Sequence, residues 1–213
     1  MRHHNINLRP ENRTPGKPIA IVPIGDVHLG SAGCSKSTLQ EDIETILWLN
    51  ENGFPTYWIG MGDYIDGITN TDPRFDGKDV DRDFMPRLDE LPQAEAEYFR
   101  DAVAPIADKC LFMLEGNHEE RLRNKTSVTN LMTSVVCGPL GIRFGGYSST
   151  ANISFGTGKT VTIFAHHGKS NAALIGSKVN VLLKMSQNLN SDISPMGHVH
   201  CTAVVPPVRL DGR

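Results

Sequence analysis

Five short apolar runs punctuate the chain, and each is followed directly by a glycine or a histidine that opens a polar stretch. Short, β-rich apolar runs bounded by glycine are typical of buried strands. The pattern therefore predicts five buried strands, each with polar residues at its carboxyl end. The predicted strands cover residues 19–24, 56–61, 110–115, 161–165 and 191–196.

Apolar residues at helical spacing lie between several of these runs. Ser37–Gln40 has the spacing of a capping box and opens a first predicted helix, in which Leu39, Ile43 and Ile46 share one face. Residues 92–108 and 178–189 are predicted to form two more helices. Alternating strands and helices are typical of an α/β layered fold. We expect one such domain over residues 19–213, preceded by a flexible polar arm at residues 1–18.

Residues 66–92 form a long insert after the second predicted strand. Between Asp72 and Glu90 it carries seven acids and four bases. A solvated loop is the simpler interpretation, and a lid or specificity loop is the functional one, because loops of this length are often functional. An acidic lid disfavours a long polyanionic substrate unless Arg74, Arg82 and Arg87 face inward.

Composition narrows the class of protein. The 213 residues are 39% hydrophobic and 21% charged, as in soluble globular proteins, and no apolar run is long enough to span a bilayer. The four cysteines form no CxxC pair, which fits a reducing compartment, and we expect a cytoplasmic protein. The net charge of -3 argues against a broad nucleic-acid-binding face.

The polar residues that follow the strands carry the candidate chemistry. In open α/β sheets, ligands bind at the carboxyl ends of the strands. Six of the eight histidines fall there, which packing alone explains poorly. The expected rim contains Asp26, His28, Asp63, Asn117, His118, His166, His167, His198 and His200.

Imidazole and carboxylate groups are usual ligands of first-row transition metals. A structural zinc needs four ligands and favours cysteine, whereas this rim offers seven or more without a cysteine motif. Two ions that share one carboxylate fit the set better, and such sites suit phosphoryl transfer. We expect two divalent ions, manganese first, with iron, zinc, cobalt or nickel as alternatives.

The order of the motifs resembles that of the calcineurin-like metallophosphoesterase family. DxH, GDxxD, GNHE, a strand-end histidine and GHxH follow one another over about residues 19–205. A lone DxH or GD would carry no weight, but five blocks in order are specific. The blocks are Asp26–His28, Gly62–Asp66, Gly116–Glu119, His166–Gly168 and Gly197–His200.

The resemblance implies a four-layer β-sandwich flanked by helices, with a dinuclear site at one edge. It assigns Asp26, His28 and His200 to the first ion and makes Asp63 the bridging ligand. Asn117, His198 and a strand-end histidine would hold the second ion. Family members usually use the histidine that precedes glycine, which favours His167 and leaves His166 as the alternative ligand or a contact beside the substrate.

The resemblance also implies hydrolysis of a phosphomonoester or phosphodiester by a hydroxide that bridges the ions. His118 is then the expected proton donor, held by Asp66. The alternative is that Asp66 only caps the turn that follows it. Arg121 is a candidate phosphate clamp or a surface partner of Glu120. Glu119 is expected to orient other residues rather than to bind metal.

Two departures bear on the substrate. Phosphoprotein phosphatases of the superfamily read GDxxDRG, whereas Gly67 follows Asp66 here, which disfavours that activity. Residues 167–185 resemble predicted phosphoesterases of bacteria and their viruses, which favours nucleotide or nucleic-acid phosphodiesters. A DNA nuclease or DNA-processing subunit, and a non-catalytic scaffold, are the alternatives. The chain ends soon after GHxH, so we also expect an exposed sheet edge that allows oligomers to form.

Overall fold

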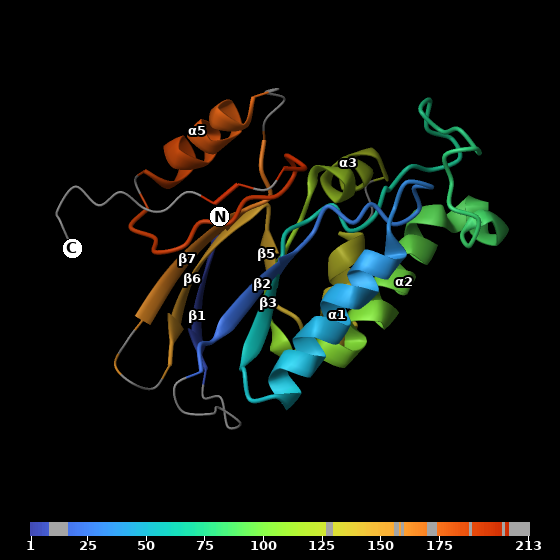
Figure 1. Ribbon diagram of the computed structural model, residues 1–213. Coiled ribbons are helices and arrows are strands. Elements are labelled where there is room, and N and C mark those ends of the chain that lie inside the picture. Colours follow the sequence, from blue (N-terminus) through green and yellow to red (C-terminus); the bar gives the residue numbers. More distant parts are fainter. Residues whose placement is uncertain are drawn as a thin grey trace.

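The computed structural model describes residues 1–8, 17–126, 130–155, 158, 160–169, 174–187, 189–201 and 203–204. Two β-sheets pack face to face, and helices α1 (Lys36–Glu51) and α2 (Leu91–Val103) cover the outer face of one sheet (Figure 1). One apolar cluster fills the space between the sheets and a second fills the space under the helices. The predicted α/β class with layered sheets and flanking helices is confirmed.

The sheet under the helices has four parallel strands in the order β2-β3-β4-β5. Parallel strands buried on both faces are near-continuous apolar runs, which is why the sequence revealed three of them. The predicted runs at 19–24, 56–61 and 110–115 correspond to the first three strands. The four strands are β2 (Ala20–Ile24), β3 (Thr56–Gly60), β4 (Cys110–Leu114) and β5 (Phe144–Gly146).

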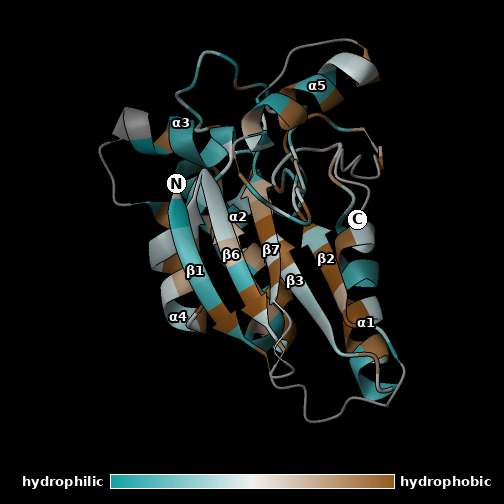
Figure 2. Ribbon diagram, turned by 90° about the vertical axis from the view of Figure 1, so that its left-hand side faces the viewer, coloured by the Kyte–Doolittle hydropathy of each residue, from teal (hydrophilic) through white to brown (hydrophobic). Residues whose placement is uncertain are grey.

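The second sheet contains β1 (Arg2–Asn7), β6 (Ser148–Ser154) and β7 (Thr160–His166), in the order β1-β6-β7. Strand β1 is parallel to β6, and β7 is antiparallel to it. Ala151 and Ile153 of β6 are buried between the sheets. The alternate positions are polar, so much of the face that points away from the core is hydrophilic (Figure 2).

The expectation of a flexible arm at residues 1–18 was wrong for its first part, because Arg2–Asn7 is a sheet strand. Its sequence is mostly polar since few of its side chains face the core. Ile6 is buried, and the ring of His4 stacks on Phe112 with 5.2 Å between ring centroids. Residues 9–16 of the expected arm lie outside the described residues.

The fifth predicted strand, 191–196, was also wrong, since it makes only isolated bridges to β7 at Ile193 and Met196. Pro195 lacks an amide hydrogen, which interrupts a regular ladder. The segment nevertheless occupies the outer edge of β7, because the Phe164 amide donates to the Ile193 carbonyl at 2.9 Å. Within the described residues this edge is therefore not exposed, and oligomer formation stays a prediction.

The first and third predicted helices are present as α1 and α5 (Ile175–Ser186). The N-cap of α1 is Ser35, two residues before Ser37, the residue that the sequence proposed for this position. The Ser35 hydroxyl accepts the Thr38 amide at 3.3 Å. The second is shorter than predicted: α2 ends at Val103 and a 3-10 helix follows. The remaining helical segments are η1 (Met85–Glu90), η2 (Ala104–Lys109), α3 (Asn117–Thr126), the π-helix η3 (Met132–Cys137) and α4 (Gly138–Leu140).

The insert at residues 66–92 lies beyond the end of the four-stranded sheet and leads through η1 into α2 (Figure 1). Two of its arginines are held by acids. Arg74 forms a two-point ion pair with Asp72, with nitrogen–oxygen distances of 2.9 and 2.8 Å. Arg87 donates to Glu97 at 2.6 Å and also pairs with Glu90.

The described helices contain no stretch with the length and apolar character that a membrane span requires. All four cysteines are free thiols, two of them buried.

Candidate metal centre and active site

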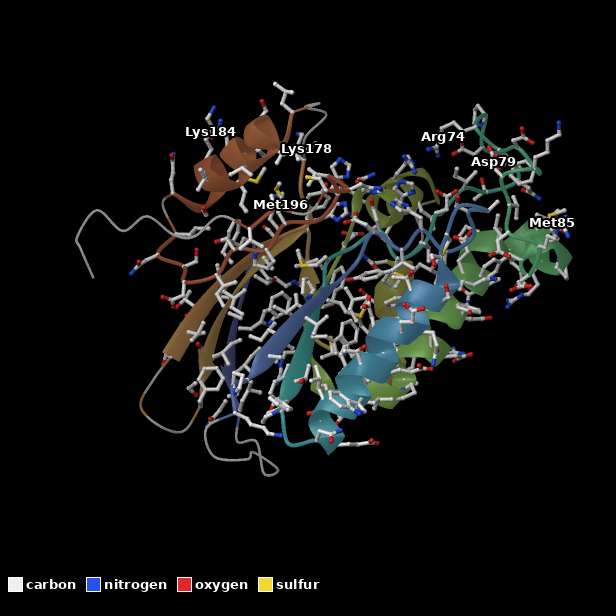
Figure 3. All side chains as sticks on the ribbon, viewed as in Figure 1. Arg74, Asp79, Met85, Lys178, Lys184 and Met196 are labelled. Carbon is white, nitrogen blue, oxygen red and sulfur yellow. The ribbon has the colours of Figure 1, made fainter. Side chains whose placement is uncertain are left out.

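Loops that follow several strands meet at one end of the two packed sheets, beside α3. Figure 3 shows the two flanks of this rim: Arg74 and Asp79 of the insert on one side, Lys178 of α5 and Met196 on the other. Because parallel strands place their carboxyl ends at one edge, residues distant in sequence become neighbours there. All nine rim residues expected from the sequence lie at or near this place, although His166 points elsewhere, as described below.

The backbone of this rim has an uncommon conformation. Among the residues that the structure describes, five residues other than glycine have φ values between 43° and 67°. This left-handed conformation costs about 1–3 kcal/mol per residue and clusters at functional sites. All five are predicted metal ligands: Asp26, His28, Asp63, His198 and His200.

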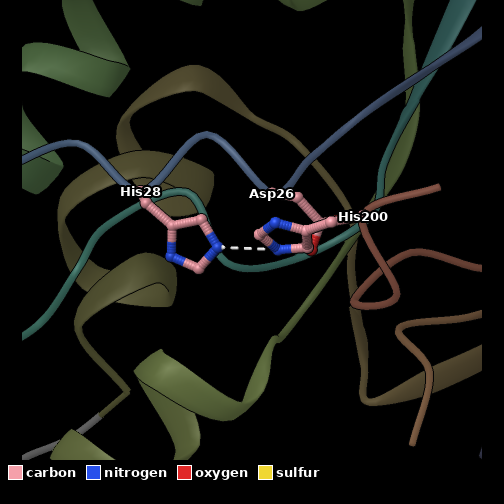
Figure 4. A group of neighbouring side chains, drawn as sticks. All are labelled: Asp26, His28 and His200. Carbon is pink, nitrogen blue, oxygen red and sulfur yellow. Dashed lines mark hydrogen bonds and ion pairs between the residues drawn. The ribbon is translucent and has the colours of Figure 1, made fainter. Parts of the chain in front are cut away.

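One donor group combines Asp26 and His28, from the loop after β2, with His200 (Figure 4). The Nε2 atoms of the two histidines are 3.2 Å apart, and His200 Nε2 lies 3.7 Å from Asp26 Oδ1. The His198 amide donates to both Asp26 carboxylate oxygens at 2.8 Å, which fixes the carboxylate. The group supplies two imidazoles and one carboxylate to a common point.

A second donor group combines Asp63, His167 and His198. His167 Nε2 lies 3.2 Å from Asp63 Oδ2 and 3.0 Å from Asn117 Oδ1. His198 Nδ1 lies 3.9 Å from the same Asp63 oxygen. Asn117 is the first residue of α3 and adds a neutral oxygen to this group.

Asp63 lies between the two groups. Its Oδ2 atom is 4.0 Å from His28 Nε2, in addition to its contacts with the second group. Its Oδ1 atom accepts the His118 amide at 2.9 Å. Burial alone would raise the pKa of this carboxyl, but the hydrogen bond and charge of His167, together with His118, hold it at about 2. Asp63 is thus a buried anion that both groups share.

The adjacent histidines have different surroundings. His167 is fully buried, and its Nδ1 donates to the Met61 carbonyl at 2.7 Å, which leaves Nε2 directed at Asp63. His166 instead accepts the Gly168 amide through Nδ1 at 2.8 Å and packs edge-on against Tyr147. The geometry favours His167 over His166 as the ligand, in agreement with the position before glycine.

The donor set fits bound cations. With its Nδ1 proton on the Met61 carbonyl, His167 directs Nε2 at two oxygen atoms that are themselves acceptors. Burial opposes a second proton on this ring, but Asp63 outweighs burial and raises the pKa of His167, so the position is satisfied either by that proton or by a cation in its place. Burial and the nearby His118 lower the pKa of His28 to about 4, which keeps this imidazole in its neutral, metal-binding form. Burial also raises the pKa of Asp26, although the His198 amide and the nearby His167 and His200 oppose it, and a bound cation would favour the charged form.

His118 and Asp66 form the predicted pair beside the donor groups. His118 Nδ1 donates to the Asp66 backbone carbonyl at 2.6 Å and lies 3.4 Å from the Asp66 carboxylate. Burial opposes protonation of His118, but Asp66 and Asp63 outweigh it and raise its pKa. The Arg121 guanidinium lies 3.3 Å from the same ring, while Glu120 pairs with Arg123 instead.

Glu119 connects the loops that carry these residues. Its buried carboxylate accepts backbone amides from the loop after β3 and from Gly116, which lies between β4 and α3. The distances are 3.1 Å to the Asp63 amide, 2.7 Å to Tyr64, 3.3 Å to Ile65 and 2.8 Å to Gly116. This supports the expected orienting role of Glu119 and explains how the two loops keep one register.

Two supporting residues were missed by sequence reasoning. The Tyr147 hydroxyl donates to the Gly168 carbonyl at 2.9 Å, and its ring packs edge-on against both adjacent histidines. Lys178 of α5 donates to the Val199 carbonyl at 2.8 Å and so ties α5 to the GHxH segment. Neither lies in a motif, and no local sequence signal distinguishes them.

Comparison with known proteins agrees with this arrangement. The family model for calcineurin-like phosphoesterase matches residues 19–201, a range that contains every rim residue described above. No curated protein and no solved structure matches the chain.

Proposed function

The chain belongs to the calcineurin-like phosphoesterase family and is therefore a metal-dependent hydrolase of phosphate esters, and from this premise we propose a dinuclear enzyme that cleaves phosphodiesters. The observation that carries the proposal is the pair of donor groups on either side of Asp63. One shared carboxylate between two sets of imidazoles is the ligand arrangement that two-metal hydrolysis requires.

In this proposal Asp26, His28 and His200 hold one ion, and Asn117, His167 and His198 hold the other, with Asp63 shared. Bound divalent ions supply Lewis acidity and lower the pKa of a water molecule that attacks phosphorus. Histidine, carboxylate and amide oxygen accept several first-row metals, with manganese as our first choice.

The remaining roles belong to side chains. His118 donates a proton to the departing oxygen, because the Asp66 carbonyl fixes its ring and its pKa is raised. Arg121 binds a non-bridging phosphate oxygen from its position beside His118. His166 belongs to none of the donor groups and accepts the Gly168 amide, so in this proposal it supports the turn at Gly168 rather than contacting the substrate.

The insert contributes to substrate selection. A cavity of about 210 Å³ lies beside Arg121, between Leu122 of α3 and insert residues that include Gly67, Thr69 and Asp72. This volume accommodates a small polar group of a substrate. Together with the net charge of -3, it favours a small diester of nucleotide type over long DNA.

The test is hydrolysis of bis(p-nitrophenyl) phosphate by the manganese-loaded protein. We expect turnover that Asp63→Ala and His118→Ala abolish, while the matched surface variants Asp101→Ala and His3→Ala keep it. No turnover with any divalent metal would refute the proposal. Equal cleavage of linear DNA and small diesters would favour the nuclease alternative. Fewer than two ions per chain after reconstitution would favour a non-catalytic scaffold.

A further inference from the structure

Glu95 is a buried acid that the proposed mechanism does not use. It lies on α2, is fully buried, and is the only side chain in the described part of the chain with a buried polar atom that lacks a hydrogen-bond partner. That atom is Oε1, whereas Oε2 accepts the Gly67 amide at 3.0 Å. Buried acids without a charged partner are rare because their desolvation is costly, so the position needs an explanation.

The carboxyl group of Glu95 contacts two loops of the site, the one after β2 at Gly30 and the one after β3 at Gly67. Gly67 directly follows Asp66, whose carbonyl accepts the His118 ring. On the other side, a Cβ atom placed on Gly30 would lie 1.9 Å from Glu95 Oε1, so the carboxyl packs directly on that backbone. Gly30 also has a φ of 101°, which only glycine adopts readily.

From these contacts we propose that Glu95 is a positioning residue that holds the Asp66–His118 pair in place through its hydrogen bond with the Gly67 amide. This inference rests on the proposed role of His118 as proton donor. Its path is short: Glu95 fixes Gly67, Gly67 fixes the Asp66 carbonyl, and the carbonyl fixes the imidazole that faces the substrate.

The charges around Glu95 favour its uncharged form. Asp66 and Glu119 both raise the pKa of Glu95, Glu95 in turn raises the pKa of the Cys34 thiol, and no base of the described residues compensates Glu95. Burial, opposed only by the Gly67 amide, raises the pKa of Glu95 to about 9.

The experiment compares Glu95→Gln, which keeps an uncharged acceptor, with Glu95→Ala, which removes it. Glu97→Gln, two residues along the same helix, is the control. Each variant is loaded with manganese and assayed on bis(p-nitrophenyl) phosphate and on diphenyl phosphate, whose leaving group depends more strongly on proton donation. Metal content and melting temperature are measured in parallel.

We expect Glu95→Gln and Glu97→Gln to keep kcat within about threefold on both substrates. Because general acid catalysis contributes about 10²–10⁴-fold, we expect Glu95→Ala to lose about 100-fold in kcat on diphenyl phosphate and about tenfold on the nitrophenyl ester, with little change in KM. If the alanine variant does not fold, Glu95→Asp replaces it, because its carboxyl group is withdrawn from Gly67 by one methylene. The same larger loss of kcat on diphenyl phosphate than on the nitrophenyl ester is then expected.

An equal loss on both substrates, or none, in a folded variant with normal metal content would overturn the inference. Wild-type protein that is inactive on both esters would instead count against the proposed function, so the two failures are distinguishable.

Discussion

Replacement of Glu119 by glutamine tests how the site is assembled. The carboxylate of Glu119 is 3% exposed and accepts four backbone amides, two through each oxygen. Glutamine keeps one oxygen but places an amide donor where the other stood. Two of the four backbone donors would then face a donor and lose their partner.

The magnitude follows from these contacts. A buried donor left without an acceptor costs about 1–3 kcal/mol, so two of them cost about 2–6 kcal/mol. Domains of this kind unfold with about 5–15 kcal/mol, so the variant would lose a large share of its stability. The loops after β3 and β4 carry Asp63 and Asn117, so metal affinity should fall as well.

The assay is urea denaturation of the metal-free protein at neutral pH, followed by metal titration. Glu120→Gln is the matched control, since Glu120 is its neighbour, is half-exposed and pairs with Arg123 at 3.8 Å. The control should change the free energy of unfolding by less than about 0.5 kcal/mol. A Glu119→Gln variant within about 1 kcal/mol of the wild type would refute the reasoning, because two lost acceptors cannot cost so little.

Three further outcomes are expected. Glu95 has a folded-state pKa of about 9 against an ordinary 4.5, so its contribution to stability is present below pH 4.5 and is lost as the pH rises toward 9, at up to about 1.4 kcal/mol per pH unit. The unfolding free energy of Glu95→Gln relative to wild type, measured at pH 5, 7 and 9, should therefore increase with pH. A difference that stays constant with pH would contradict this. His167→Ala should weaken metal binding by more than about 100-fold in a metal titration, whereas His166→Ala should stay below that, as outer partners do; equal effects would contradict the ligand assignment. Chelation of the metals should abolish turnover and lower the melting temperature, because ions at about 100 times their Kd add about 2.7 kcal/mol of stability; an unchanged melting temperature would count against ions bound in the folded state.

The strands that carry the site were predictable because their sequences are unambiguous. Strands β3 and β4 are largely buried on both faces, and the edge strand β2 is apolar and half-buried, so all three form continuous apolar runs that end at the loops with the candidate ligands. The ordered motifs predict that Asp26, Asp63 and His198 lie at one rim.

The second sheet was mostly hidden from the sequence. Strands β1 and β6 have small or polar residues at alternate positions, and only side chains such as Ile6 and Ile153 are apolar and buried. Such strands form because a partner strand completes their backbone hydrogen bonds, which composition does not report. For residues 191–196 the error was the opposite one: a strand was predicted, but Pro195 interrupts the ladder and only isolated bridges form.

Supporting contacts were the least predictable part of the site. Glu95 sits in an ordinary amphipathic helix pattern, and its contact with Gly67 spans 28 residues. The left-handed backbone at the ligands also has no sequence signature, because aspartate and histidine adopt it only when the surrounding structure holds them there.

The most direct test of the account is electron paramagnetic resonance of the protein reconstituted with two equivalents of Mn²⁺. Two ions that share Asp63 would lie about 3.5–4 Å apart and give the spectrum of a spin-coupled pair, which Asp63→Asn should convert to that of isolated ions. A six-line spectrum of uncoupled Mn²⁺ in the wild type, with one ion bound per chain, would contradict the shared centre.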